Sequence, residues 1–268
     1  MITLSQDSLK ILIYTLNGRE AIRLALGHYN LLPEDVVTIM TTSGNSYISN
    51  CVTSEIEKFC TWSRNLEQNT KLIFVNHEFG YPFNQLEGLK KYDLPIIEDC
   101  AHSFFTKDPQ NVIGTIGDFV IFSFPKMFPI QIGGLLVQKG DFDLPKSRLL
   151  NVSETQYIKN VLSHYIQNMD EIIEKRKLNF LYLSKEFRKL GFKERFLINE
   201  GIVPGVFMFQ ANGQKIDLQM LKEHFYSNGI QCSVFYGEES FFIPVNQALN
   251  ENDLSYFVEV MKMFLTRI

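Results

Sequence analysis

The first hundred residues alternate short apolar runs with segments of helical pattern, and this alternation constrains the fold more than any other feature. The strands expected are 36–40, 71–75 and 94–99, and the helices expected are 19–27, a segment from the polar turn at 42–46 to Glu57, and 85–91. Parallel strands require such crossover segments, whereas hairpins do not. The pattern therefore predicts an α/β fold, with a mostly parallel sheet sandwiched by helices.

The second half of the chain has a different pattern. Apolar runs at 119–124 and 135–137 have no helix-length segment between them, so they are expected to pair as antiparallel neighbours. A long helical region follows, and the remainder alternates short strands with helices, which is typical of a small α+β domain. The predicted domains are a large domain at 1–150, a connecting helical region at 151–190 and a small C-terminal domain at 191–268.

Composition excludes several classes of function. The 268 residues carry a net charge of −4, so no broad basic surface for nucleic acid or an acidic membrane is expected. The four cysteines form no C-x-x-C pair, which favours free thiols in a reducing compartment over disulfides or a metal site. The N-terminus shows no signal-peptide pattern, and no apolar run approaches the ~20 residues that span a bilayer. A cytoplasmic protein is expected.

Three residues stand where chemistry is expected in such a sheet. Gly18 opens a helix, whose N-terminal N–H groups favour a phosphate, and Asp99 ends a buried strand, where a carboxylate needs a partner. Lys126 lies in a loop after another strand. Each has an ordinary explanation alone, as a capped turn, a structural carboxylate and a solvated amine. Together they are the phosphate cradle, acid and amine that pyridoxal phosphate (PLP) requires.

Several segments resemble one family, the DegT/DnrJ/EryC1/StrS sugar aminotransferases, which are PLP enzymes of fold type I. The similar segments are 16–26, a His-x-x-Gly-x-Pro loop at 77–82, a Glu-Asp block at 96–103, Gly114–Asp118, Phe122–Phe124, and Lys126 with six residues between it and Gly133-Gly134. The resemblance extends over most of the chain, including 169–176 and a segment from Ile243 to Leu254. It implies a PLP-transferase large domain followed by a small α+β domain.

The resemblance also implies a role for each matching residue. The cofactor-binding residues implied are Gly18, Arg19, Tyr47, Asp99, His102, Ser123 and Lys126. Of these, Lys126 is implied to bond covalently to PLP and to shuttle a proton, and Asp99 to pair with the pyridine nitrogen. Tyr47 is implied to stack on the ring, with His102 beside it. Ser123 and the N–H groups of Gly18 and Arg19 are implied to bind the phosphate.

The activity implied is amino transfer to a keto-sugar nucleotide, for surface polysaccharide or related sugar biosynthesis. Glutamate or glutamine is the implied donor and a homodimer the implied assembly. Lys126 argues against the related dehydratases, which have histidine in its place. Arg19 replaces the usual threonine, the path from Ser123 to Lys126 is two residues shorter than usual, and no Asn-x-Arg segment follows Gly134. Two alternatives therefore stay open: a catalytically impaired homologue retained as a binding or assembly subunit, and a cradle for another phosphate ligand.

Overall fold

A computed structural model describes residues 10–108, 112–145, 150–211, 213 and 215–267. The chain divides into two compact units. The first comprises Met1–Glu78, Pro82–Phe104 and Asp108–Gln167, and the second comprises Phe79–Tyr81, Phe105–Lys107 and Asn168–Ile268. Residues 1–9, in which the sequence shows no signal-peptide pattern, lie outside the described part. Among the described helices, none combines the length and apolar character needed to cross a membrane.

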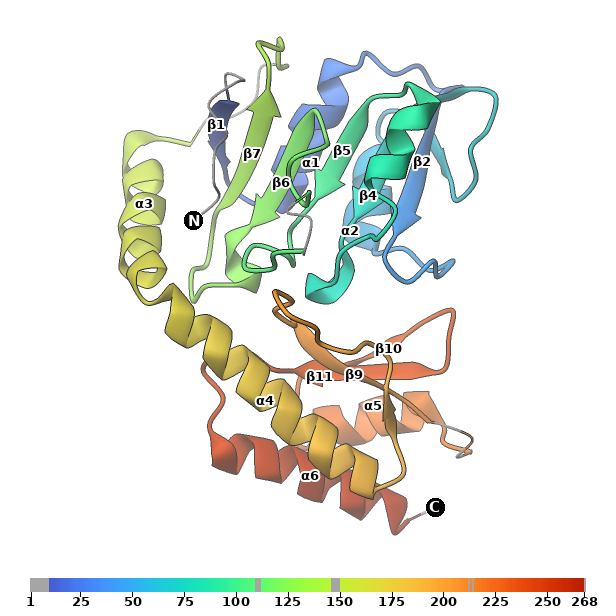
Figure 1. Ribbon diagram of the computed structural model, residues 1–268, viewed down its shortest axis with the longest axis vertical. Coiled ribbons are helices and arrows are strands. Elements are labelled where there is room, and N and C mark those ends of the chain that lie inside the picture. Colours follow the sequence, from blue (N-terminus) through green and yellow to red (C-terminus); the bar gives the residue numbers. More distant parts are fainter. Residues whose placement is uncertain (1–9, 109–111, 146–149, 212, 214, 268) are drawn as a thin grey trace. The chain divides into compact units, whose positions relative to one another are not determined.

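The first unit is built on a seven-stranded sheet (Figure 1), in the order β1-β7-β6-β5-β4-β2-β3. The strands are β1 (Lys10–Thr15), β2 (Val36–Thr41), β3 (Thr61–Ser63), β4 (Thr70–Asn76), β5 (Ile96–Asp99), β6 (Phe119–Ser123) and β7 (Gly134–Lys139). Strand β7 runs antiparallel to both of its neighbours, and the pairs from β6 to β3 are parallel. The predicted mostly parallel sheet and the antiparallel pairing of its last two predicted strands are confirmed.

Helices cover one face of this sheet. Helices α1 (Gly18–His28) and α2 (Asn50–Ile56) begin where Asn17 and Ser49 accept hydrogen bonds from the first turn. The apolar residues of α1 from Ala21 to Leu26 pack with those of α2 and the strands into one core. The opposite face carries a 3₁₀-helix, η2 (Glu87–Tyr92), where the sequence predicts a helix at 85–91. Helix α3 (Val152–Gln167) ends the first unit.

The second unit is a small α+β domain with its own core. Its elements are α4 (Met169–Lys189), β8 (Lys193–Glu194), β9 (Val206–Gln210), α5 (Leu218–Ser227), β10 (Ser233–Phe235), β11 (Ser240–Pro244) and α6 (Glu251–Leu265). The four strands pair antiparallel in the order β10-β11-β9-β8. The core is rich in phenylalanine, which accounts for much of the high phenylalanine content of the chain.

Four strands have no counterpart in the sequence analysis. They are β1, β3, β8 and β11. Strand β1 is an edge strand whose side chains are mostly half-buried, so its apolar pattern is weak without its partner β7. Strands β3 and β8 have only three and two residues, and β11 ends at Pro244. The segment predicted as a connecting helical region at 151–190 contains two helices, α3 and α4, which separate at Asn168.

Candidate active site

The carboxyl ends of the parallel strands form one edge of the first unit's sheet. In the strand register, neighbours across this edge are Thr41, Asn76, Asp99 and Ile121, followed by Ser123, Gly134 and Thr15. Ligands of α/β sheets bind outside this edge. Asp99, Ser123 and the start of α1 therefore lie on the side of the sheet where the sequence places a site.

The N-terminus of α1 lies against the end of β6. A Cβ added to Gly18 would lie 3.2 Å from the Cβ of Ser123, so the helix start and the serine are in close contact. The side chain of Asn17 accepts the N–H of Glu20 at 3.0 Å. The N–H groups of Gly18 and Arg19 donate to no other residue in the described part of the chain. Two N–H donors beside a hydroxyl are suited to an anion such as phosphate.

Asp99 is a buried carboxylate, 5% exposed, at the end of β5. The N–H of Ala101 donates to its Oδ1 at 2.9 Å. Burial raises the pKa of Asp99, and the positive charge of Lys126 and the Ala101 hydrogen bond oppose that rise. An acid in such a place strongly favours a cationic N–H partner.

Lys126 ends a 3₁₀-turn, η3 (Phe124–Lys126), that directly follows β6. Burial lowers the pKa of its amine, and the negative charge of Asp99 raises it in opposition. The residue as a whole is exposed, so part of its surface is open to solvent although the protein crowds its amine. Since Lys126 and Asp99 each shift the pKa of the other, their charges act within one site.

The remaining predicted site residues are Tyr47, His102 and Arg19, and the structure gives their position in the fold and their exposure. Tyr47 lies in the loop between β2 and α2 and is 42% exposed. Cys51, four residues after Tyr47 and within α2, raises the pKa of Lys126 through an electrostatic interaction. This segment therefore lies near the Lys126 amine. His102 is half-buried just after β5, and Arg19 is exposed in the first turn of α1. Their roles as cofactor ligands rest on these positions and stay predictions.

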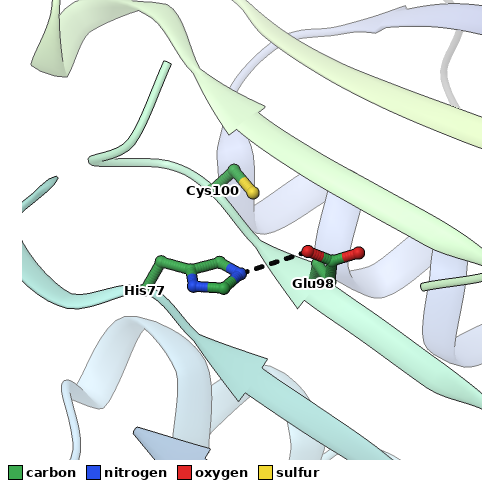
Figure 2. A group of neighbouring side chains, drawn as sticks. All are labelled: His77, Glu98 and Cys100. Carbon is green, nitrogen blue, oxygen red and sulfur yellow. Dashed lines mark hydrogen bonds and ion pairs between the residues drawn. The ribbon is translucent and has the colours of Figure 1, made fainter. Parts of the chain in front are cut away.

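Sequence analysis missed a buried cluster beside Asp99. His77, Glu98 and Cys100 are fully buried, and their nearest ligand-type atoms lie within 4.8 Å of one another (Figure 2). Burial raises the pKa of the Cys100 thiol, as do the charges of Glu98 and Asp99, so the thiol stays protonated. His77 and Glu98 bond to each other and to backbone N–H groups. His77 and Glu98 are therefore part of a hydrogen-bonded network, although together with Cys100 they offer the donor types of a metal site.

A second missed residue, Glu78, fixes the loop that carries Tyr47. Its carboxylate accepts the N–H of Ser43 at 2.7 Å, and its own N–H donates to the hydroxyl of Thr42 at 3.1 Å. Burial raises the pKa of Glu78, while Ser43 and the positive charge of Arg64 oppose the rise. The one feature of the sequence that could have pointed to Glu78 is its place as a charged residue within the His-x-x-Gly-x-Pro loop.

Aminotransferases are among the solved structures that share this fold. The aminotransferase TlmJ from Streptoalloteichus hindustanus matches with a TM-score of 0.76 at 14% identity, covering 96% of this chain and 86% of that one. The sugar aminotransferase CalS13 from Micromonospora echinospora matches with a TM-score of 0.71 at 17% identity, covering 94% and 87%. The fold is thus that of the PLP-dependent aminotransferases, and the predicted fold class is confirmed.

Sequence comparison narrows the class to a family. Residues 10–156 match the model of the DegT/DnrJ/EryC1/StrS aminotransferase family, and the chain belongs to that family. Its members are PLP-dependent. GDP-perosamine synthase of Escherichia coli O157:H7 is 30% identical over 142 residues, 45% of this chain and 38% of that protein. The uncharacterized protein MJ1066 of Methanocaldococcus jannaschii is 34% identical over 92 residues, 32% of this chain and 24% of that protein. The matches thus span less than two thirds of each curated relative.

Proposed function

We propose that this protein is a PLP-dependent aminotransferase that acts on a keto-sugar nucleotide. The observation that carries the proposal is the mutual electrostatic influence of Asp99 and Lys126 at the carboxyl edge of the sheet. An acid and an amine so placed suit the two reactive ends of one PLP molecule. The remaining groups at this edge fit the cofactor as well.

The start of α1 fits the phosphate. The N–H groups of Gly18 and Arg19 make no hydrogen bond to other described residues, and the Ser123 hydroxyl lies next to Gly18. The Arg19 guanidinium adds a donor that can bind a phosphate dianion in a bidentate manner. Glu20, the acid in this turn, accepts a hydrogen bond from the Leu16 N–H at 2.7 Å, so its carboxylate already has a partner.

Bound PLP supplies an electron sink for the carbon that loses or gains the amino group. Asp99 would hold the protonated ring nitrogen of PLP through a hydrogen bond, and its burial keeps water from screening the carboxylate charge. Lys126 has a lowered pKa, so a larger fraction of its amine is neutral and able to act as nucleophile and proton acceptor. With PLP bound, Asp99 would hold the ring and the Lys126 amine would move the proton at the reacting carbon.

The family supports the proposed substrate class. GDP-perosamine synthase, the relative named above, is named for a product linked to a nucleotide. We infer a nucleotide-linked keto-sugar as amino acceptor, glutamate or glutamine as donor, and a role in surface polysaccharide or related sugar biosynthesis. A cytoplasmic homodimer is part of the same proposal.

One observation favours a second function. Only Phe124 and Pro125 separate Ser123 from Lys126, and all three residues after Ser123 lie in the tight turn η3. A short path can place the amine away from the reacting carbon, and about 1 Å of misplacement can cost roughly a hundredfold in rate. The alternative is a member that binds PLP without transferring amino groups and serves as a binding or assembly subunit.

A spectroscopic titration distinguishes these functions. Adding PLP to the protein is expected to produce a saturable visible absorbance band that Lys126→Arg abolishes, with Lys126→Gln as a second variant. Adding glutamate or glutamine is then expected to remove the band, because the amino group is transferred. A band that persists with every donor supports the binding subunit. Absence of any band in the wild-type protein overturns the PLP proposal.

A further inference from the structure

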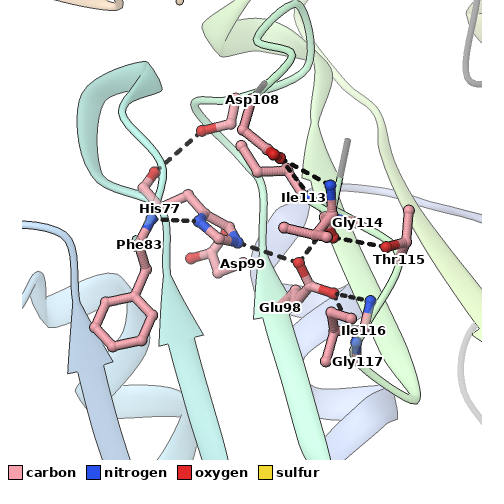
Figure 3. Close-up of polar contacts among 12 residues, drawn as sticks. His77, Phe83, Glu98, Asp99, Asp108, Ile113, Gly114, Thr115, Ile116 and Gly117 are labelled. Carbon is pink, nitrogen blue, oxygen red and sulfur yellow. Dashed lines mark hydrogen bonds and ion pairs between the residues drawn. The ribbon is translucent and has the colours of Figure 1, made fainter. Parts of the chain in front are cut away.

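The carboxylate of Glu98 is surrounded by hydrogen-bond donors from a single loop (Figure 3). Its Oε1 accepts the N–H groups of Ile116 at 2.8 Å and Gly117 at 2.6 Å, and its Oε2 accepts that of Gly114 at 2.7 Å. Burial by itself raises the pKa of Glu98, but the hydrogen bonds from His77, Gly117 and Gly114 outweigh it and lower the pKa. Glu98 is therefore an ionised, fully buried acid that binds the 114–117 loop.

The loop fits against Glu98 with little free space. A Cβ on Gly117 would lie 2.8 Å from the carbonyl oxygen of Phe119, 3.0 Å from that of Ile96 and 3.1 Å from Cγ of Glu98. The first of these distances is too short for a real Cβ without a shift of the backbone, and the other two are tighter than most Cβ contacts. The glycine thus allows the loop to approach the carboxylate directly.

His77 joins the same carboxylate to the neighbouring strand. Its Nδ1 accepts the N–H of Phe83 at 3.0 Å, so Nδ1 carries a lone pair and the proton of the neutral ring is on Nε2. This Nε2–H donates to Oε2 of Glu98 at 3.2 Å. The imidazole is therefore fixed in tautomer and orientation at both nitrogens.

The backbone of His77 also contacts Asp99. Its N–H donates to the carbonyl oxygen of Asp99 at 3.1 Å, and its own carbonyl accepts the Ser103 hydroxyl at 3.3 Å. His77 thus bonds to both members of the Glu98-Asp99 pair, one through its ring and one through its main chain. Because neighbouring residues of a strand point to opposite faces, Glu98 is held on one face while Asp99 projects from the other.

We propose that Glu98, with His77, is a positioning residue that fixes the orientation of the Asp99 carboxylate toward the cofactor. The proposal rests on the proposed function, in which Asp99 pairs with the PLP ring nitrogen. The carboxylate of Glu98 anchors β5 to β4 through His77 and to the 114–117 loop through three N–H groups. A cation in this cluster is disfavoured, because both nitrogens of His77 and both oxygens of Glu98 already have partners.

The test substitutions are Glu98→Gln and, as a matched control, Glu194→Gln. A glutamine at position 98 has only one side-chain oxygen that can accept hydrogen bonds. Its amide NH₂ group is a donor, so it would face N–H donors that the second carboxylate oxygen of Glu98 accepts in the wild type. Glu194 is a similarly buried carboxylate, 5% exposed, that accepts hydrogen bonds from Ser184 and Arg188, and it lies in the second unit. Both variants are expected to be less stable than the wild type, because each replaces a buried carboxylate that accepts hydrogen bonds. Only Glu98→Gln is expected to weaken PLP binding, by roughly ten- to a hundredfold.

A second measurement reads the position of Asp99 without any cofactor. Carbon-13 NMR of the side-chain carboxyls, with Asp99→Asn to assign the signal, gives the pKa of Asp99 in each protein. In Glu98→Gln this pKa is expected to fall toward the ordinary value for aspartate, because a loosened strand end admits water. In Glu194→Gln it is expected to equal that of the wild type.

The outcomes separate the two proposals. An unchanged Asp99 pKa in Glu98→Gln, or an equal loss of PLP affinity in both variants, overturns the positioning role. Failure of the wild type to bind PLP overturns the proposed function, and the Asp99 titration then decides the positioning role alone. Should Glu98→Gln not fold, amide hydrogen exchange of the wild type replaces it: protection of residues 114–117 is expected to rise when PLP binds. Unchanged protection on PLP binding contradicts the proposal.

Discussion

Gly134→Ala is expected to destabilise the first unit and to weaken anion binding at α1. A Cβ at this position would lie 2.6 Å from Oγ1 of Thr15 and 2.7 and 2.8 Å from the carbonyl carbon and oxygen of Asn17. Ordinary contact begins at 3.4 Å, so the new methyl is 0.6–0.8 Å too close, mostly to backbone atoms that cannot rotate away. Overpacking of this kind costs about 1–3 kcal/mol. For a chain of this size, at about 2 °C per kcal/mol, the Tm is then expected to fall by roughly 2–6 °C.

The binding effect has the same origin. Asn17 caps α1, so a shift of its carbonyl group moves the N–H groups of Gly18 and Arg19. Inorganic phosphate and PLP are both expected to bind more weakly, as measured by calorimetry. Gly88→Ala is the control, because a Cβ there meets no atom within 4 Å and the residue has no positive φ. If Gly134→Ala and Gly88→Ala show the same Tm and the same affinity for phosphate, the close packing of β7 against the Asn17 turn is refuted.

Three further predictions follow from single residues. Arg19→Ala is expected to weaken phosphate and PLP binding about tenfold, through loss of a charge-assisted hydrogen bond, whereas Arg23→Ala, one turn later on α1, leaves both affinities unchanged; equal losses in calorimetry would contradict a phosphate role for Arg19. Burial raises the pKa of Glu78, so its protonated form favours the folded state and wild-type stability falls as the pH rises above 4.5 through the folded pKa. Glu78→Gln is expected to remove this fall and to unfold at the same or a slightly higher temperature at pH 7; a clear loss of Tm at pH 7 would refute the argument. The pKa of Glu98 is lowered from 4.5, so its stabilisation is present above that pH and is lost as the pH falls through the folded pKa. The Tm difference between wild type and Glu98→Gln is therefore expected to shrink below pH 4.5, and a constant difference would contradict an ionised Glu98.

The sequence carries enough local information to predict most of the first unit. Helix α1 is marked by its Asn17 cap and dense apolar residues, and the parallel strands by apolar runs separated by crossover segments. Asp99 and Lys126 could be predicted as site residues because Asp99 ends one buried strand and Lys126 lies in the turn after the next strand along the chain. The register of the sheet then places them at one edge, which the sequence could only suggest.

The network around Glu98 could not be predicted in this way. Its partners in the 114–117 loop are backbone N–H groups, which every residue but proline offers, so no residue type marks them. These N–H groups also lie 16 to 19 residues after Glu98 in the sequence, which is farther than a local sequence pattern extends. Strand β1 was missed for a related reason, since its place depends on pairing with β7 more than 100 residues away.

The most direct test of the account is to locate the covalent bond to PLP. The protein is incubated with PLP, reduced with borohydride and digested, and the labelled peptide is identified by mass spectrometry. Lys139 provides an internal competitor, because its amine is buried with no hydrogen-bond partner among the described residues and burial lowers its pKa. The account predicts a pyridoxyl label on Lys126 at full occupancy and none on Lys139. A label on Lys139 or on scattered surface lysines, with Lys126 unmodified, would contradict it.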